Sequence, residues 1–370
     1  MSKLDELIAE LCPDGVEYVR LAECCDIEDN KRKPVKSSLR IPGDTPYYGA
    51  NNIQDYVEGY THYGQYVLIA EDGSASLENY SVQYVDGFFW ANNHVHVIKG
   101  RKDLDTKFLY YYLTSFNFIP FLTGGTRAKL NKGNMEEIPI PIPPLPVQQE
   151  IVRILDNFTE LTAELTAELT ARRKQYEYYR DLLLTFDDDV PMKPLSEVCV
   201  LSAGGDVPKR HFSKEKTNEY KVPIYSNGIG DNALYGWTNE ARINNPCITI
   251  AARGTIGYVA LRNEPFVPVV RLICAIPKEC INVRYLKYAT ETLNFKVPTS
   301  GIPQLTVPMI GKYNIPVPPL EEQERIVSIL DRFDALCNDL TSGIPAEIEA
   351  RQKQYEYYRD KLLSFKEVTA

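Results

Sequence analysis

The sequence has no apolar run long enough to cross a bilayer, and its N-terminus, "MSKLDELIAELC", alternates charge with leucine and is not a secretory signal. Its eight cysteines include no CxxC pair, so neither a zinc knuckle nor a disulfide framework is indicated. The formal charge is −9, which argues against a chain that is basic over its whole surface. We therefore expect a cytoplasmic protein with about two or three domains.

The motifs of catalysis are also missing. No glycine-rich loop follows a strand and opens a helix, which excludes both phosphate-binding signatures. "PIPPLP" and "PVPPLE" lack the Asn/Asp-Pro-Pro-aromatic pattern of an amino-methyltransferase, and "GGDVPKR" (204–210) lacks the second carboxylate of a nuclease site. His94 and His96 could ligate a metal, but packing or a surface position is the more frequent role of such a pair, and we predict no metal site. These absences favour a binding protein over an enzyme.

What the sequence does contain is an internal repeat of whole segments. The octapeptide "KQYEYYRD" occurs at 174–181 and again, letter for letter, at 353–360. A proline-rich entry precedes each copy, "IPIPIPPLPVQQEIVRILDNF" at 138–158 and "NIPVPPLEEQERIVSILDRF" at 314–333. Because proline is excluded from helix interiors, a long helix is predicted to begin after each entry. Acidic residues suit the positive ends of the two helix dipoles: Glu150, Glu321, Glu322 and Glu324.

Apolar residues recur in steps of three and four along both predicted helices, as in a coiled-coil seam. In the first helix, "TELTAELTAEL" (159–169) repeats with period four and interrupts the heptad. The second copy is offset by 175 residues before this region and by 179 after it, and the added step holds Gly343 and Pro345, so a bend or break is expected there. The predicted seam residues are Ile154, Phe158, Leu161, Leu165, Leu169, Tyr176, Tyr179 and Leu183, then Ile329, Phe333, Leu336, Leu340, Ile344, Ile348, Tyr355, Tyr358 and Leu362.

Two such seams most simply bury each other as an antiparallel pair. The alternative is that each helix packs on its own domain.

The segments between the helices share a frame but differ in sequence. "VRLAECCDI" (19–27) aligns with "KPLSEVCVL" (193–201), and "VLIAEDGSA" (67–75) aligns with "ITIAARGTI" (248–256). Runs such as "QYVLIA", "NHVHVIKG" and "PCITIA" predict strands joined by Gly/Asn/Asp turns, whereas "TKFLYYYLTS" and "VRYLKYATE" predict short helices. The expected fold class is α+β, with two mixed, strand-rich α/β lobes joined by two long antiparallel coiled-coil helices in a pseudo-twofold repeat. The predicted boundaries are 1–145 for the first lobe, 146–186 for a central helix, 187–320 for the second lobe and 321–366 for a distal helix.

Charge is unevenly divided between the lobes. Residues 1–145 hold 14 basic and 20 acidic residues, and residues 187–320 hold 15 basic and 12 acidic residues. Any contact with DNA must therefore come from local loops in which Lys and Arg neutralise phosphates and Asn, Gln and Arg pair with base edges. For each loop the alternative is an ordinary solvated turn. The candidates are Lys31, Arg32, Lys33, Lys36, Asn51, Asn52, Arg127, Lys129, Lys132, Lys209, Arg210, Lys214, Asn227, Arg253 and Gln304.

With its duplicated "IPxPPL…QxxIVxILDxF…KQYEYYRDxLLxF" segments, its TAEL units and two lobes in equivalent frames, the chain resembles the specificity subunit of type I restriction–modification enzymes from end to end. The resemblance implies that each lobe is a target-recognition domain that reads one half of a split sequence in double-stranded DNA. It also implies that the helices hold the lobes apart and bind two methyltransferase subunits, which flip and methylate one adenine in each half-site.

Motor-nuclease subunits are expected to join that assembly. S-adenosylmethionine, ATP and Mg²⁺ are then expected on partner subunits only, and this chain carries no cofactor. Because the lobes differ, the target should be asymmetric, and the helical spacer should set the gap between its halves. The competing interpretation is a DNA-independent coiled-coil adaptor, favoured by the acidic first lobe. An enzyme in its own right is a third class.

Overall fold

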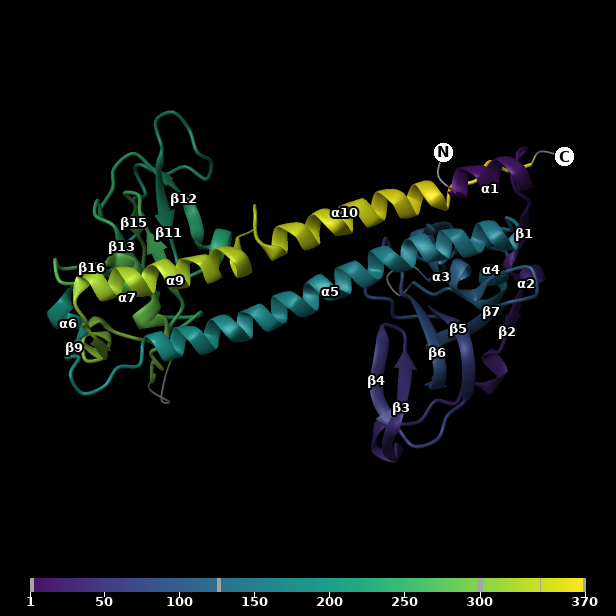
Figure 1. Cartoon of the computed structure of the whole chain (residues 1–370), viewed down its shortest axis with the longest axis horizontal. Coiled ribbons are helices and arrows are strands. Elements are labelled where there is room, and N and C mark those ends of the chain that lie inside the picture. The colour runs from purple at the N-terminus through teal and green to yellow at the C-terminus, as the bar shows by residue number, and fades with distance from the viewer. Residues whose placement is uncertain (1–2, 125–127, 298–301, 340, 369–370) are drawn as a thin grey trace. The chain divides into compact units, whose positions relative to one another are not determined.

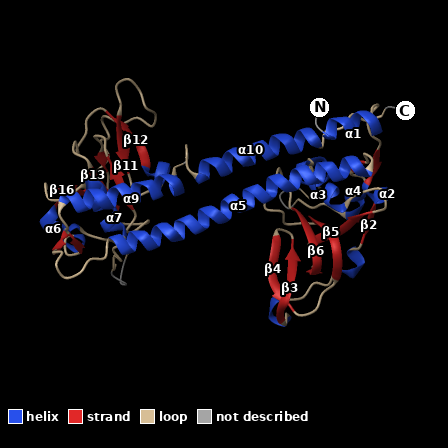
Figure 2. Cartoon of the chain, in the orientation of Figure 1, coloured by secondary structure: helices blue, strands red, loops and turns tan. Residues whose placement is uncertain are grey.

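The computed structural model describes residues 3–124, 128–297, 302–339 and 341–368. The chain divides into two compact units, one comprising Met1–Thr166 with Glu347–Ala370 and the other comprising Ala167–Ala346. Each unit combines one strand-rich lobe with part of the long helices, so the predicted mixed α+β class is confirmed (Figure 2). Within the described ranges, no helix combines the length and the apolarity needed to cross a membrane.

The lobe of the first unit is built on a six-stranded sheet with strand order β2-β7-β5-β6-β3-β4, and a two-stranded ladder β1-β8 lies beside it (Figure 1). Most neighbours pair antiparallel, but β3 and β6 pair parallel. The strands are β1 Tyr18–Arg20, β2 Cys25–Ile27, β3 Pro42–Gly49, β4 Asn52–Val57, β5 His62–Ala70, β6 Val82–Ala91, β7 Val95–Gly100 and β8 Pro139–Pro141.

Helix α3 (Thr106–Ser115) covers this sheet. It begins after the N-cap Asp105, whose carboxylate accepts hydrogen bonds from the backbone amides of Lys107 and Phe108. Its apolar face, which includes the buried Phe108 and Leu109, packs into the main core with Val67, Ile69 and Ile98 of the strands. The shorter helices of the first unit are α1 Lys3–Leu11, α2 Leu21–Cys24 and α4 Lys132–Glu136.

The lobe of the second unit repeats this plan with smaller sheets. Their strand orders are β10-β16-β13-β14, β12-β11-β15 and β17-β9. The strands are β9 Met192–Pro194, β10 Cys199–Ala203, β11 Val222–Tyr225, β12 Leu234–Thr238, β13 Cys247–Ala251, β14 Val259–Arg262, β15 Val267–Pro268, β16 Leu272–Pro277 and β17 Asn314–Pro316. The helices of this lobe are α6 Leu195–Val198, α7 Val283–Glu291 and α8 Val307–Ile310.

The two lobes agree element by element where the sequence predicts a shared frame. The strand–helix–strand run β1-α2-β2 corresponds to β9-α6-β10, and β5 corresponds to β13. Helices α3 and α7 begin and end at the predicted residues, and each starts from a side-chain cap, Asp105 or Asn282. The internal repeat therefore extends from the helices into the folds of both lobes.

The first long helix, α5, runs without interruption from Leu145 to Leu183, and residues of both units belong to it (Figure 1). It begins directly after Pro143 and Pro144, as the proline rule requires. Glu150 lies beyond its first turn, so the predicted role of this residue at the helix dipole is wrong. Glu150 instead pairs with Lys3 and Arg153, whereas Glu321 and Glu322 do lie in the first turn of α9.

The distal segment, predicted at 321–366, forms two helices, α9 (Leu320–Asn338) and α10 (Ile344–Leu362). The predicted break at Gly343 is confirmed. A Cβ added to Gly343 would lie 2.6 Å from the carbonyl oxygen of Ala335 and 2.7 Å from that of Asp339, so only glycine fits there. The four extra residues of the second repeat fall in this interruption.

Aromatic stacks pair the helices inside each unit. In the first unit, Phe158 of α5 stacks on Tyr358 of α10, and in the second unit Tyr179 of α5 stacks on Phe333 of α9, with ring centroids 5.6 Å apart in both cases. Within the first unit, residues near the start of α5 share a core with residues after the end of α10, such as Leu363. Each pair therefore runs antiparallel.

The predicted seam is only partly buried. Leu161, Tyr179, Leu336 and Tyr358 are exposed, Ile344 is buried, and Leu340 lies outside the described residues. The half-buried seam residues are Ile154, Phe158, Leu165, Leu169, Tyr176, Leu183, Ile329, Phe333, Ile348, Tyr355 and Leu362. Near the helix starts, the lobe cores bury residues outside the predicted seam: Val147, Ile151 and Leu155 of α5, and Ile326, Val327 and Leu330 of α9. Both interpretations therefore hold, packing on the lobe at the helix starts and helix pairing farther along.

Candidate nucleic-acid interface

The basic segment after β2, which the sequence predicts to contact DNA, is tied to its own lobe by ion pairs. Arg32 is 16% exposed, lies 3.3 Å from Asp29 and 2.7 Å from Glu71, and donates to the carbonyl oxygen of Val95 at 2.7 Å. Lys129, from a distant loop, pairs with the same Glu71 at 2.7 Å. These two candidate cations therefore neutralise carboxylates of the lobe and hold the segment in place.

Buried His96 belongs to the same network. Its Nδ1 lies 2.6 Å from Asp29, and its Nε2 lies 2.8 Å from the carbonyl oxygen of Leu130. Burial acts to raise the pKa of Asp29, but hydrogen bonds from His96 and the amide of Val97 outweigh it and leave that pKa lowered. His94 is exposed and contacts Asp72. Across the described part of the chain, no group of three His, Cys, Asp or Glu residues is placed to hold a metal ion.

Two lysines of the basic segment remain available to a ligand. Lys31 pairs with Glu28 at 2.7 Å. Lys33 and Lys36 are exposed, and neither has an ion-pair partner among the residues that the structure describes. The backbone of Lys33 is fixed, because its carbonyl oxygen accepts a hydrogen bond of 2.7 Å from the indole of Trp90. The structure thus presents two free cations on an ordered backbone.

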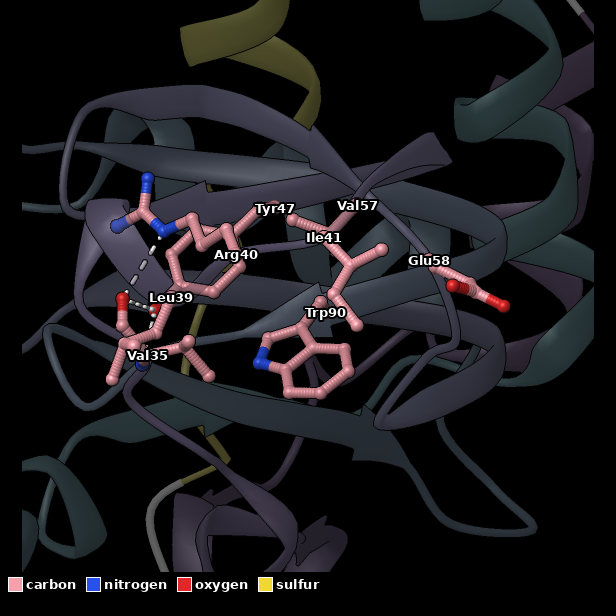
Figure 3. Close-up of a pocket in the computed structure, with 8 residues that line it drawn as sticks. All are labelled: Val35, Leu39, Arg40, Ile41, Tyr47, Val57, Glu58 and Trp90. Atoms are coloured by element: carbon pink, nitrogen blue, oxygen red, sulfur yellow. Dashed lines mark hydrogen bonds between the residues drawn. The ribbon is translucent and has the colours of Figure 1, made fainter.

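A pocket of about 140 Å³ opens in the same segment (Figure 3). The Arg40 guanidinium lies 4.0 Å from the centroid of the Tyr47 ring, donates to the carbonyl oxygen of Val35 at 3.1 Å, and pairs with Asp55 at 3.2 Å. These contacts hold the pocket wall without a ligand. The lining residues are Val35, Leu39, Arg40, Ile41, Tyr47, Val57, Glu58 and Trp90. No local pattern in the sequence indicates this pocket, because β3, β4 and β6 bring its residues together.

The other candidates of the first lobe lie in turns. Asn51 holds a loop, since its amide donates to the carbonyl oxygen of Gly73 at 2.7 Å and accepts from the amide of Ala75 at 2.8 Å. Asn52 is exposed with a φ of 130°, a value that favours glycine or asparagine. Lys132 lies 3.6 Å from Glu136. Arg127 lies outside the described residues.

In the second lobe, cations lie over aromatic rings beside β12. Lys209 and Arg210 are exposed. Lys214 lies 4.6 Å from the centroid of Tyr235, and Lys216, which is not among the candidates predicted from the sequence, lies 4.9 Å from that of Trp237. The alternating lysines of "SKEK" were the signal for this pair, but the aromatic partners come from a separate strand.

Asn227 and Arg253, from two separate loops of the second lobe, are brought together. The Asn227 amide donates to the carbonyl oxygen of Arg253 at 2.7 Å, and the Thr255 hydroxyl donates to the carbonyl oxygen of Asn227. Both residues are half-buried, so they fix the loops more than they extend from them. Gln304 is exposed on a third loop.

The duplicated octapeptide is used in the same way in both units. Tyr176 and Tyr355 pack against the lobe cores, and Tyr179 and Tyr358 form the aromatic stacks. Tyr178 and Tyr357, however, are 64% and 63% exposed. Packing inside the chain explains why the inward tyrosines are identical, but it does not explain why the outward ones are.

Two stretches of the chain, residues 13–172 and 187–350, match a family model described as the type I restriction modification DNA specificity domain. The chain is 46% identical to a putative type I restriction enzyme specificity subunit of Haemophilus influenzae, over 95% of this chain and 96% of that one. It is 33% identical to a putative type I specificity subunit of Mycoplasma pneumoniae, over 95% and 98% of the two chains. A type I restriction enzyme specificity subunit of Escherichia coli is 36% identical over 70% of each chain.

A solved structure has the same fold. The crystal structure of a type I restriction–modification system S subunit from M. genitalium superposes with a TM-score of 0.61, at 18% identity, over 94% of this chain and 95% of that one.

Proposed function

The chain belongs to the family of type I restriction–modification specificity subunits, whose role is DNA target recognition, and from this premise we propose that each lobe reads one half of a bipartite, asymmetric DNA sequence while α5 sets the gap between the halves. As a specificity subunit the chain is non-catalytic and carries no cofactor itself. It directs adenine methylation and restriction by its partner subunits, where S-adenosylmethionine, ATP and Mg²⁺ act, in the cytoplasm.

The observation that carries the proposal is the continuity of α5. One uninterrupted helix of 39 residues supplies residues to both units. A continuous α-helix is stiff and rises about 1.5 Å per residue, so it is suited to act as a ruler between two DNA-reading lobes. A flexible linker of the same length would permit many gaps, because its end-to-end distance varies widely.

The asymmetry of the target is supported by the unlike loops. In the first lobe, free lysines, Lys33 and Lys36, flank an aromatic pocket, whereas in the second lobe Lys214 and Lys216 lie over aromatic rings. Different side chains on corresponding loops read different base edges. The domain boundaries 1–145, 146–186, 187–320 and 321–366 follow from the same proposal, with a target-recognition domain before each helical segment.

The outward tyrosines support two identical partners. Two surfaces that share an exposed octapeptide fit two copies of one protein, and we assign them to two methyltransferase subunits, with motor-nuclease subunits completing the assembly. Large exposed aromatic residues are the side chains that most often dominate protein–protein interfaces.

The test is to map methylated adenines in DNA from cells that carry this chain with its partner subunits. The proposal expects one split site with two unlike halves and a constant gap. The alternative, a DNA-independent adaptor, expects no site-specific methylation and no binding of duplex DNA that weakens steeply with salt. DNA binding without dependence on salt or sequence would refute the proposal.

A further inference from the structure

A buried glutamine joins the first lobe to its helix. Gln148, in the first turns of α5, is fully buried. Its Nε2 donates to the carbonyl oxygens of Asp103 at 2.8 Å and Pro143 at 2.6 Å, and its Oε1 accepts from the amide of Asp105 at 2.8 Å. All three partners are backbone atoms, so the joint does not depend on which side chains the lobe carries there.

The second lobe has the same joint. Gln323 of α9, which is offset from Gln148 by 175 residues, is also fully buried. Its Nε2 donates to the carbonyl oxygens of Cys280 at 3.0 Å and Pro318 at 2.8 Å, and its Oε1 accepts from the amide of Asn282 at 2.8 Å. The lobe residues differ between the two joints, but the hydrogen bonds are the same.

A second contact lies two turns farther along each helix. Asp156 of α5 accepts hydrogen bonds from Lys107 at 2.8 Å and from the Tyr111 hydroxyl at 2.6 Å. Asp331 of α9 accepts from its counterparts, Arg284 and, at 2.7 Å, Tyr288. The donors lie on α3 or α7.

Each glutamine also binds the cap residue of that same helix, Asp105 or Asn282. Every lobe is thus held to its long helix at two points, eight residues or about 12 Å apart.

Two directional contacts fix an orientation that apolar packing alone does not. Burial of apolar surface is non-directional, so a lobe held only by Ile151 and Leu155 could rotate about the helix at little cost. Hydrogen bonds weaken steeply with angle, and a buried amide that loses its partners is strongly disfavoured. Rotation of the lobe would break all three bonds of the glutamine at once.

We propose that Gln148 and Gln323 are positioning residues, which together with Asp156 and Asp331 lock the rotation of each lobe on its helix and so make the chain strict about the gap between half-sites. This inference rests on the proposed function, because it concerns how precisely the gap is kept. A loosened joint lets a lobe reach a half-site displaced by one base pair.

The experiment compares the full chain with its Gln148→Ala variant, each assembled with its partner subunits. Methylation rates are measured on duplexes whose gap is correct, one base pair longer or one base pair shorter. We expect Gln148→Ala to reduce the preference for the correct gap about tenfold, and Gln323→Ala to do the same through the other lobe. Ile151→Val is the matched control, because it removes one methyl group from the same buried helix start and keeps all three hydrogen bonds.

Equal gap preference in Gln148→Ala and Ile151→Val would overturn the inference. If Gln148→Ala does not fold, Asp156→Asn tests the second contact, since it removes the charge that pairs with Lys107 and keeps the size of the side chain; an unchanged gap preference in that variant counts equally against the inference. Absence of any preferred gap in the unmodified chain is a different result, because it would refute the proposed function itself.

Discussion

Phe158 stacks on Tyr358 with ring centroids 5.6 Å apart, and 175 residues after Phe158 its counterpart, Phe333, stacks at the same distance on Tyr179. Each stack takes its phenylalanine from one repeat and its tyrosine from the other. Each unit is therefore completed by the tail of the opposite repeat, and both copies of "KQYEYYRD" must keep the same tyrosine.

The length of α5 should set the gap in the target. Deletion of one TAEL unit, residues 166–169, shortens the helix by about 6 Å and rotates the rest of the helix by about 40°. One base pair advances DNA by about 3.4 Å with a twist near 34°. We expect a gap shorter by about one base pair with both half-sites unchanged, as mapped by the methylated adenines. Glu164→Gln keeps the length and should keep the gap; an unaltered gap in the deletion variant contradicts the ruler.

Exchange of the first lobe should change half of the target. When residues 1–145 are replaced by the lobe of another family member, we expect a new sequence in one half-site and the old sequence in the other. The backbone-only joint at Gln148 is the physical reason that a foreign lobe can dock. Sequencing of methylated sites gives the answer, and a change in both halves would show that the lobes are not independent.

Removal of one outward tyrosine should remove one partner. Tyr178→Ala or Tyr357→Ala truncates an aromatic side chain that is almost two-thirds exposed, and interface aromatics of this kind contribute about 2 kcal/mol or more to binding. We expect each single variant to retain one methyltransferase subunit and the double variant none, as measured by mass in solution. Tyr60→Ala, which truncates a similarly exposed tyrosine in the first lobe, is the control and should retain both.

The free lysines of the first lobe should neutralise phosphates. For Lys33→Ala combined with Lys36→Ala we expect the slope of log K against log salt to fall by about one unit for each phosphate that is no longer neutralised. Lys102→Ala, an exposed lysine between β7 and α3, provides a charge-matched control for either single variant. An identical slope before and after the double substitution would place the DNA contacts elsewhere.

The start of α5 should lose stability in acid. Hydrogen bonds from Arg153 and Lys3 lower the pKa of Glu150 to about 2, from an ordinary value of 4.5. A carboxyl group with a lowered folded-state pKa stabilises the fold above pH 4.5 and loses that contribution as the pH falls towards 2. Because both cations are largely exposed, we expect Glu150→Gln to cost only about 1 kcal/mol at pH 7.

Urea unfolding of both proteins between pH 7 and pH 3 measures this difference, which should shrink as the pH falls. A difference that stays constant over this range would show that the ionised carboxylate does not stabilise the fold.

Much of the fold could be predicted because its signals are local. Prolines mark the start of α5, Gly343 marks the break, and α3 and α7 have capped, periodic sequences. The joint at Gln148 could not be predicted, since its three hydrogen bonds join residues that only the folded chain brings together.

The candidate site was less predictable for the same reason. A run of basic residues does not reveal that Arg32 is paired with Glu71 while Lys33 is free, because Glu71 comes from a strand end 39 residues away. Nor does it reveal the pocket that Tyr47 and Trp90 line, which forms only when β3 and β6 pair. Charge is written in the sequence, but its neutralisation depends on the tertiary fold.

The two glutamine joints have a consequence for descent. A lobe held through main-chain atoms can accumulate changes over its loops, or be replaced outright, without any matching change in the helix that carries it. Lineages can thus acquire new targets by recombination while inheriting the same scaffold, so that selection for novelty and selection for assembly act on separate parts of one gene.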